Sequence, residues 1–442
     1  FTEPLLSLAG FEEMTKTAEK SSGLISVTGC IDAQKSQMIY AFGGHRKNKL
    51  IVTFGEQKAK ELYDEYSFFD KEVVYYPSKD VLFYQSDIRG NLLTAERIRA
   101  LKAIHEQERV TLVTTFDALM NTMAPIEKMW ENVLTLEQRQ LLDLKEIQAA
   151  LIRMGYEKEY QVQTMGQFSV RGGILDVFPL TEENPIRIEL WGDEIDTIRY
   201  FDCESQKSIE NTDRVSIYPA AELVLSDEEK ARGIEKLKAE AKRVSDKLRK
   251  QMKTEEAHRV SVMADELTEE WGELSMYAGM DAFLSYFFDE RVGLLDYFKP
   301  SDSLIFFDEL TRCTEQGKLT ETEFSESMKQ RLAMGYILPG QMNGLFTEKE
   351  IVAKLEKYSC IALGALDNKA NGLHQLGSYG IHCQSVSPYN NSFELLIKDL
   401  KRYKKNGYRV ILLSGSRTRA KRLSEDITDQ GITCFYTENY DH

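Results

Sequence analysis

Two short stretches of the chain carry the residue types that bind nucleotide phosphates in proteins. The first, GCIDAQKS from Gly29 to Ser36, places Lys35 and Ser36 where a phosphate loop of the form GxxxxGK[ST] has its lysine and hydroxyl. In such a loop, backbone N–H groups surround the phosphates, the lysine neutralises their charge and the hydroxyl ligates magnesium. The second is the apolar run LIFF, which ends in Asp308 and Glu309. Its form is that of the strand that holds magnesium in P-loop enzymes.

The first stretch departs from a working phosphate loop at two positions. Gln34 replaces the second glycine, and its side chain should obstruct the tight wrap of the backbone. Asp32 puts a negative charge where phosphates would lie. We therefore predict no catalytic residue in the chain and a degenerate, inactive nucleotide site made of Gly29, Lys35, Ser36, Asp308 and Glu309. The alternative, an ATP-hydrolysing enzyme, requires this site to work despite Gln34.

A second kind of site is predicted between Gly166 and Asp202, where strand-forming residues alternate with turn formers as in a four-stranded antiparallel meander. Alternation along its longest strand places Arg187 and Trp191 on the face opposite the core. Tryptophan and arginine dominate binding energy at protein interfaces. Two interpretations remain open: either this face binds a partner, or Trp191 packs under the loop TEEN and Arg187 pairs with Glu189 or Asp193.

The elements that position these residues alternate between strand and helix over the first 128 residues, which predicts an α/β fold with a parallel sheet covered on both faces. The strand that ends in Asp308 is expected to return to that sheet. We predict a first domain in two parts, residues 1–128 and 219–347. An α+β insertion, residues 129–218, separates these parts, and a small α/β domain, residues 348–442, follows. In the last domain, strands are expected at 360–366, 383–386, 409–414 and 432–436.

The charge of the chain argues against nucleic-acid binding by the whole surface, because its 442 residues carry a formal net charge of −15. The region 393–422 is a local exception, with ten Lys or Arg residues and two acidic residues on helix-like segments. Solvated helix faces or a DNA contact both explain this pattern. Ser414-Gly415-Ser416 precedes the second segment, as a helix N-cap or as an anion site.

Six scattered cysteines without a CxxC pair indicate a reducing, cytoplasmic location. The neighbours His382 and Cys383 would point to opposite faces of a strand, so we infer no metal site. No apolar run approaches the ~18 residues of a membrane span, and we expect no membrane partner. The chain starts without Met and stops just after a predicted strand, so we expect it to be a piece of a longer protein.

The segments VRGGILDVFP and PIRIELWGDEIDTIRYFDCESQKS resemble the UvrA-binding domain of transcription-repair coupling factors, which is related to domain 2 of the excision nuclease subunit UvrB. The resemblance extends over essentially the whole chain, through VTGCIDAQKS, FFDEL and SPYNNSFELLIKDLKRYKKNGYRVILL. It implies a UvrB-like module with a degenerate P-loop-like domain and no ATPase activity, which recruits UvrA in transcription-coupled nucleotide excision repair.

The family's UvrA contacts are an arginine in the VRGG turn, an arginine in the next long strand and an aromatic residue four positions later. They match Arg171, Arg187 and Trp191. The chain departs from the related UvrB pattern at Ser169, where that pattern has a further arginine, and it has Trp where Phe is more usual.

The same resemblance implies that RNA polymerase, DNA, ATP and magnesium bind to other domains of the family's proteins, outside the part that this chain matches. No cofactor is expected within this chain. The complete protein is expected to be an ATP-dependent DNA translocase.

Overall fold

The computed structural model describes residues 3–8, 10–42, 46–79, 90–273, 279–366, 372–386 and 388–438. The chain divides into two compact units. The larger unit comprises residues 5–382, and the smaller unit comprises residues 383–442 with the first four residues.

The centre of the larger unit is a seven-stranded sheet whose neighbouring strands are all parallel. The strand order is β15, β1, β14, β13, β2, β4, β3. The strands are β1 (Gly23–Thr28), β2 (Asn48–Thr53), β3 (Val74–Tyr76), β4 (Val110–Thr115), β13 (Ser303–Asp308), β14 (Ser359–Gly364) and β15 (Gln375–Gly380). The expected return of the strand before Asp308 is confirmed, because β13 lies between β14 and β2.

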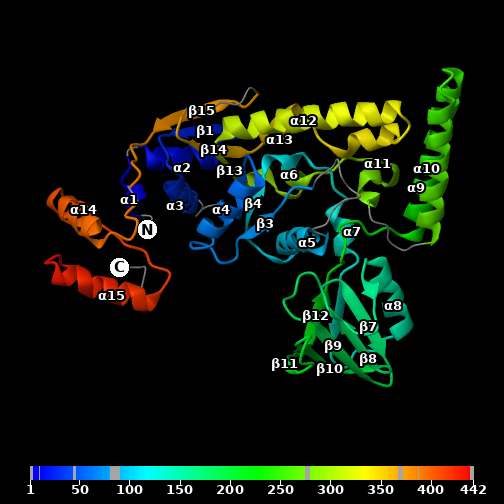
Figure 1. The fold of residues 1–442 in the computed structure, drawn as a ribbon, viewed down its shortest axis with the longest axis horizontal. Helices are drawn as coiled ribbons and strands as arrows, with labels where there is room; N and C mark the ends of the chain where they lie inside the picture. The colour runs from blue at the N-terminus through cyan, green and yellow to red at the C-terminus, as the bar shows by residue number, and fades with distance from the viewer. Residues whose placement is uncertain are drawn as a thin grey trace. The chain divides into compact units, whose positions relative to one another are not determined.

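Helices cover both faces of this sheet (Figure 1). After the short α1 (Glu3–Leu6), one face is covered by α2 (Phe11–Lys20), α3 (Asp32–Phe42) and α4 (Glu56–Tyr66). The other is covered by α5 (Gly90–Glu106), α6 (Phe116–Met120), α12 (Leu310–Ala333) and α13 (Glu348–Leu355). Strand side chains alternate between the layers, so Leu50 and Val52 pack on one face and Ile51 on the other.

After α7 (Ile126–Trp130), the chain leaves this sheet and builds a second one, of mixed type, with strand order β11, β10, β9, β8, β7, β6. Helix α8 (Leu144–Arg153) packs on its apolar face (Figure 1). The strands are β6 (Glu157–Lys158), β7 (Gln167–Arg171), β8 (Ile174–Val177), β9 (Ile186–Trp191), β10 (Glu194–Phe201) and β11 (Ser208–Thr212). The strands β5 (Leu134–Glu137) and β12 (Arg214–Ile217) form a separate antiparallel pair. The predicted four-stranded meander is confirmed as β7 to β10.

The chain then forms a pair of long helices, α9 (Asp227–Lys250) and α10 (Thr254–Glu273), before it re-enters the parallel sheet. Helix α9 begins with a capping box, in which Ser226 and Glu229 satisfy each other's backbone N–H groups. Short helices follow: η1 (Met280–Phe283), α11 (Leu284–Phe287), η2 (Leu294–Tyr297), η3 (Pro300–Asp302) and, after α12, η4 (Pro339–Gly344). None of the helices in the described part of the chain has the length and apolar character that a membrane crossing requires.

The boundary predicted at residue 348 is wrong. Helix α13 and strands β14 and β15 belong to the larger unit, and the division falls between residues 382 and 383. Strand β14 is completely buried between β1 and β13, so it completes the first sheet and does not begin a new one. The expected strand at 383–386 is also wrong, since the strand of this region is β15.

The smaller unit contains two helices, α14 (Phe393–Lys405) and α15 (Arg417–Asp429). The strands expected at 409–414 and 432–436 are not present among the described residues. Their sequences favour β structure, but a strand needs a neighbour to pair its backbone N–H and C=O groups. Ser416 is the N-cap of α15 and accepts a hydrogen bond from the backbone N–H of Arg419, 3.4 Å away.

Candidate functional site

Two tight hairpins of the second sheet present the residues assigned to partner binding. Arg171 ends β7 and is followed by Gly172, whose φ of 60° is one that glycine adopts without steric cost. Arg187 and Trp191 lie on β9, which turns into β10 through Gly192 at φ 65°. Because β7, β8 and β9 are neighbours, the two arginines point to the same face of the sheet.

Asp176 on β8 holds both arginines in place. Its Oδ2 lies 2.8 Å from Nη2 of Arg171 and 2.8 Å from Nη2 of Arg187, and its Oδ1 lies 2.7 Å from Nε of Arg187. The Asp176 side chain is only 1% exposed. In the strand register, Asp176 lies directly opposite Arg187. The carboxylate therefore organises the site, although the sequence analysis did not single it out.

The two arginines differ in how far they reach solvent. Arg187 is 12% exposed, donates a further hydrogen bond of 2.8 Å to Gln206, and lies 4.3 Å from the ring centroid of Phe201. Hydrogen bonds to Asp176 raise the pKa of Arg187, and burial opposes this rise only in part. Arg171 is 35% exposed. Arg171 can therefore reach a partner directly, whereas Arg187 mainly fixes the position of Asp176.

Trp191 is 84% exposed at the end of β9. The interpretation that it packs under the neighbouring loop is therefore wrong. Arg187 pairs with neither Glu189 nor Asp193, because Asp176 takes that role and Glu189 pairs with Arg199. An exposed indole and a fixed guanidinium on the same face of one sheet are residue types typical of binding hot spots.

Ser169, the position that departs from the related arginine pattern, is buried. Its hydroxyl donates a 3.1 Å hydrogen bond to the backbone carbonyl of Tyr160. Gln167 also holds the segment before β7, because its side-chain oxygen accepts hydrogen bonds from the backbone N–H groups of Gln163 and Thr164. This segment therefore covers position 169, while the Tyr160 ring itself is exposed.

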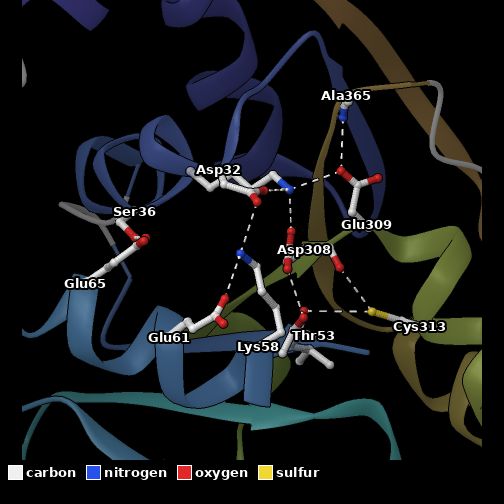
Figure 2. Close-up of polar contacts among 12 residues, drawn as sticks. Asp32, Ser36, Thr53, Lys58, Glu61, Glu65, Asp308, Glu309, Cys313 and Ala365 are labelled. Atoms are coloured by element: carbon white, nitrogen blue, oxygen red, sulfur yellow. Dashed lines mark hydrogen bonds and ion pairs between the residues drawn. The ribbon is translucent and has the colours of Figure 1, made fainter. Parts of the chain in front are cut away.

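Three of the five residues of the predicted nucleotide site, Lys35, Asp308 and Glu309, also come together, in a cluster of side chains at the ends of β1, β2 and β13. Lys35 Nζ lies 2.5 Å from Asp308 Oδ1, 2.9 Å from Asp32 Oδ1 and 3.1 Å from Glu309 Oε1. Asp32, Asp308 and Glu309 point toward one another in Figure 2. Thr53 donates a 2.9 Å hydrogen bond to Asp308 Oδ2. We call these five residues the Lys35 cluster.

Lys35 stays charged in this cluster although its side chain is only 2% exposed. Burial lowers the pKa of Lys35, but the ion pair with Asp308 and the hydrogen bonds to the carboxylates outweigh burial, so its pKa is raised. The hydrogen bond from Lys35 lowers the pKa of Asp32. The positive charge that would neutralise a phosphate is therefore already neutralised by the protein.

Backbone N–H groups of the turn are also occupied. Those of Gly29 and Cys30 donate to the carbonyls of Ala365 and Gly364, at 3.3 and 3.1 Å. A Cβ atom at Gly29 would lie 2.1 Å from the carbonyl oxygen of Ile381, so the backbone after β15 passes directly over the turn. The Ser36 hydroxyl donates to Glu65 at 3.3 Å (Figure 2).

The carboxylates after β13 are likewise engaged within the protein. Besides its contact with Lys35, Glu309 accepts a 3.1 Å hydrogen bond from the backbone N–H of Ala365 (Figure 2). Its backbone has φ 57° and ψ 63°, a left-handed conformation that a non-glycine residue rarely adopts. This turn directs the Glu309 side chain back to Lys35. Among the described residues, no group of three His, Cys, Asp or Glu side chains is arranged to hold a metal ion.

Comparison with known proteins gives one family match within the chain. Residues 134–223 match the UvrB interaction domain. This range contains the second sheet, with Arg171, Asp176, Arg187 and Trp191.

Similar proteins extend the comparison to most of the chain. A transcription-repair-coupling factor from Bacillus subtilis is 26% identical over 392 residues, which is 88% of this chain and 33% of that protein. One from Staphylococcus aureus strain MRSA252 is 25% identical over 435 residues, or 96% of this chain and 35% of that protein. The chain thus spans about a third of the length of these relatives. The resemblance inferred from the sequence is confirmed.

Proposed function

We propose that this chain is the UvrB-like, non-catalytic module of a transcription-repair coupling factor, and that it recruits UvrA to stalled RNA polymerase in transcription-coupled nucleotide excision repair. The observation that carries the proposal is that Arg171, held by buried Asp176, and exposed Trp191 share one face of the second sheet, inside the range that matches the UvrB interaction domain. We call the surface formed by Arg171, Asp176, Arg187 and Trp191 the hairpin face.

The hairpin face is suited to a protein partner because its main contact groups are already oriented. Ordering a flexible arginine on binding costs about 0.5–1.5 kcal/mol, and the hydrogen bond from Arg171 to Asp176 reduces that cost in advance. Trp191 offers a large apolar area from a short, paired strand end. We therefore expect the UvrA surface to carry a carboxylate for Arg171 beside an apolar pocket for Trp191.

The Lys35 cluster supports the non-catalytic part of the proposal. An ATP phosphate would have to displace three carboxylates from Lys35 and break the hydrogen bonds of Gly29 and Cys30. Because these groups already bind other parts of the protein, the turn can support the fold without binding or hydrolysing a nucleotide. In this proposal, ATP, magnesium, RNA polymerase and the DNA of the translocation step are handled by other parts of a coupling factor in the cytoplasm, and this module contributes UvrA binding.

The test is a calorimetric titration of purified UvrA with the 442-residue chain. The variant Arg171→Ala/Trp191→Ala should bind on the order of 2–4 kcal/mol more weakly, since both residue types form hot spots. The matched control is Ile152→Ala/Arg153→Ala, which alters an exposed apolar residue and an arginine on α8, on the other side of the same sheet. Equal affinities of wild type, variant and control would refute the proposal.

A further inference from the structure

The smaller unit differs in charge from the rest of the chain. Its described residues 383–438 contain ten Lys or Arg and six Asp or Glu, a net charge of +4, whereas the chain as a whole carries −15. All ten cationic side chains belong to exposed residues. Positive charge is therefore concentrated on about 56 residues of an acidic protein. These residues belong to the smaller unit, whereas the hairpin face and the Lys35 cluster belong to the larger unit.

Helix α14 has an apolar side and a basic side. Its apolar residues contribute to a small core shared with α15, composed mainly of Ile397, Leu400, Ile427 and Ile432. Four cations follow the helical repeat at positions i, i+3, i+4 and i+7: Lys398, Lys401, Arg402 and Lys405. At 1.5 Å per residue, they form a row about 10 Å long on one side of the helix. One strand of a duplex presents about three phosphates over that length.

The first two turns of α15 add four more cations and no acidic residue: Arg417, Arg419, Lys421 and Arg422. Cations at this end of a helix oppose the helix dipole and lower its stability. The same chain follows the usual preference in α9, whose first turn contains Asp227, Glu228 and Glu229. The basic start of α15 is thus unfavourable for the isolated helix and becomes favourable when an anion is bound.

Most of these cations have no carboxylate partner within the unit. Asp399 pairs with Arg402, and Glu438 pairs with Arg417, both at the exposed surface. In the described part of the chain, no ion pair involves six other cations of the two helices: Lys398, Lys401, Lys404, Lys405, Arg419 and Arg422. The unit therefore carries unbalanced positive charge that an external polyanion would neutralise.

Aromatic side chains lie among the cations. Tyr403 and Tyr408 contact each other edge to face, with ring centroids 5.7 Å apart, and the Arg402 guanidinium lies 5.1 Å from the Tyr403 ring. Tyr408 and Phe435 are largely exposed. Exposed rings beside cations are the pattern on which unpaired bases stack in proteins that bind single strands.

We propose that the smaller unit binds nucleic acid without sequence preference, through the phosphodiester backbone. The row on α14 and the cations at the start of α15 contact phosphates, and Tyr408 and Phe435 stack on bases where these are unpaired. This contact is independent of the UvrA-binding function proposed for the hairpin face.

The test is fluorescence anisotropy of the 442-residue chain with a labelled 30-nucleotide single strand and the matching duplex, at 50 to 200 mM NaCl. For the duplex, we expect log Kobs to fall with log salt with a slope of about −3 or steeper. Lys398→Gln/Lys401→Gln/Lys405→Gln should weaken binding at least tenfold and reduce the slope by about 2–3. Tyr408→Ala should weaken binding of the single strand alone.

The matched control is Lys238→Gln/Lys242→Gln/Lys247→Gln, which removes three exposed lysines from α9 in the larger unit. It changes the net charge by the same amount, so it should leave binding within twofold of wild type. The proposal is overturned if the folded wild-type chain does not bind either oligonucleotide at 50 mM NaCl. Equal loss in the α14 variant and the α9 control also overturns it, as does equally tight binding of polyglutamate.

Discussion

Replacing Lys35 by methionine tests whether the Lys35 cluster is a closed, structural element. Methionine fills a similar volume, so the substitution removes the charge and creates little empty space. It leaves Asp308, which is 1% exposed, without its cation and next to Asp32 and Glu309. The carboxylate then stays buried and unpaired in the folded protein, but it is hydrated in the unfolded chain.

The magnitude follows from the contacts that remain. Removing one partner of a buried ion pair costs about 3–5 kcal/mol, because the other charge is left uncompensated. Thr53 still donates a hydrogen bond to Asp308, so we expect the lower end of that range, about 3 kcal/mol. Adding Asp308→Asn removes the uncompensated charge. The double variant should therefore be about 2 kcal/mol more stable than the sum of the two single substitutions.

The assay is urea unfolding followed by far-ultraviolet circular dichroism, for the wild type, both single variants and the double variant. Lys58→Met is the matched control, because Lys58 pairs with Asp32 at 3.2 Å but Asp32 is largely exposed. Its cost should stay below about 1 kcal/mol. Loss of less than 1 kcal/mol in Lys35→Met, or strict additivity in the double variant, would refute the account of a buried, self-neutralised cluster.

Three other predictions concern the hairpin face, the buried carboxylate Glu222, which pairs with Arg97 at 2.7 Å and with Lys79 at 2.9 Å, and the phosphate-loop turn. Asp176→Asn should lower affinity for UvrA at least tenfold in calorimetry, because Arg171 and Arg187 lose the negative charge and one of the two oxygens that hold them; unchanged affinity would show that the guanidiniums need no charged anchor. Burial raises the pKa of Glu222, but the ion pairs with Arg97 and Lys79 outweigh burial and lower this pKa to about 2. The stability that the ionised Glu222 provides is therefore complete above about pH 4.5 and is lost as the pH falls from 4.5 to 2. Thermal unfolding should show this loss in the wild type and a flatter pH profile in Glu222→Gln; parallel profiles would contradict it. A fluorescent ATP analogue at about 1 mM should show no saturable binding, and saturation would show that the phosphate loop still works.

The meander could be predicted because its signals are local. Gly172 and Gly192 mark two-residue turns, and alternation along β9 separates Arg187 and Trp191 from the core. The role of Asp176 could not be predicted in the same way. It depends on the register between β7, β8 and β9, and no short-range pattern specifies which side chains lie opposite each other.

The last part of the parallel sheet was harder to predict for a related reason. Residues 359–364 form a typical buried strand, but their place between β1 and β13 is set by packing of segments far apart in the sequence. Residues 375–380 contain two glycines and few apolar residues, so their pairing with β1 at the sheet edge overrides a weak strand preference. Conversely, the apolar runs at 409–414 and 432–436 have strong strand preference but no paired neighbour among the described residues.

Hydrogen exchange of the chain with and without UvrA tests the central claim most directly, because it locates the contact without any substitution. The account predicts slower exchange in peptides that contain the Arg171–Gly173 turn and the Trp191–Asp193 turn, with unchanged exchange on α8. Protection confined to α14 and α15, or absent from both turns while UvrA is bound, would contradict the assignment of the hairpin face as the UvrA-binding site.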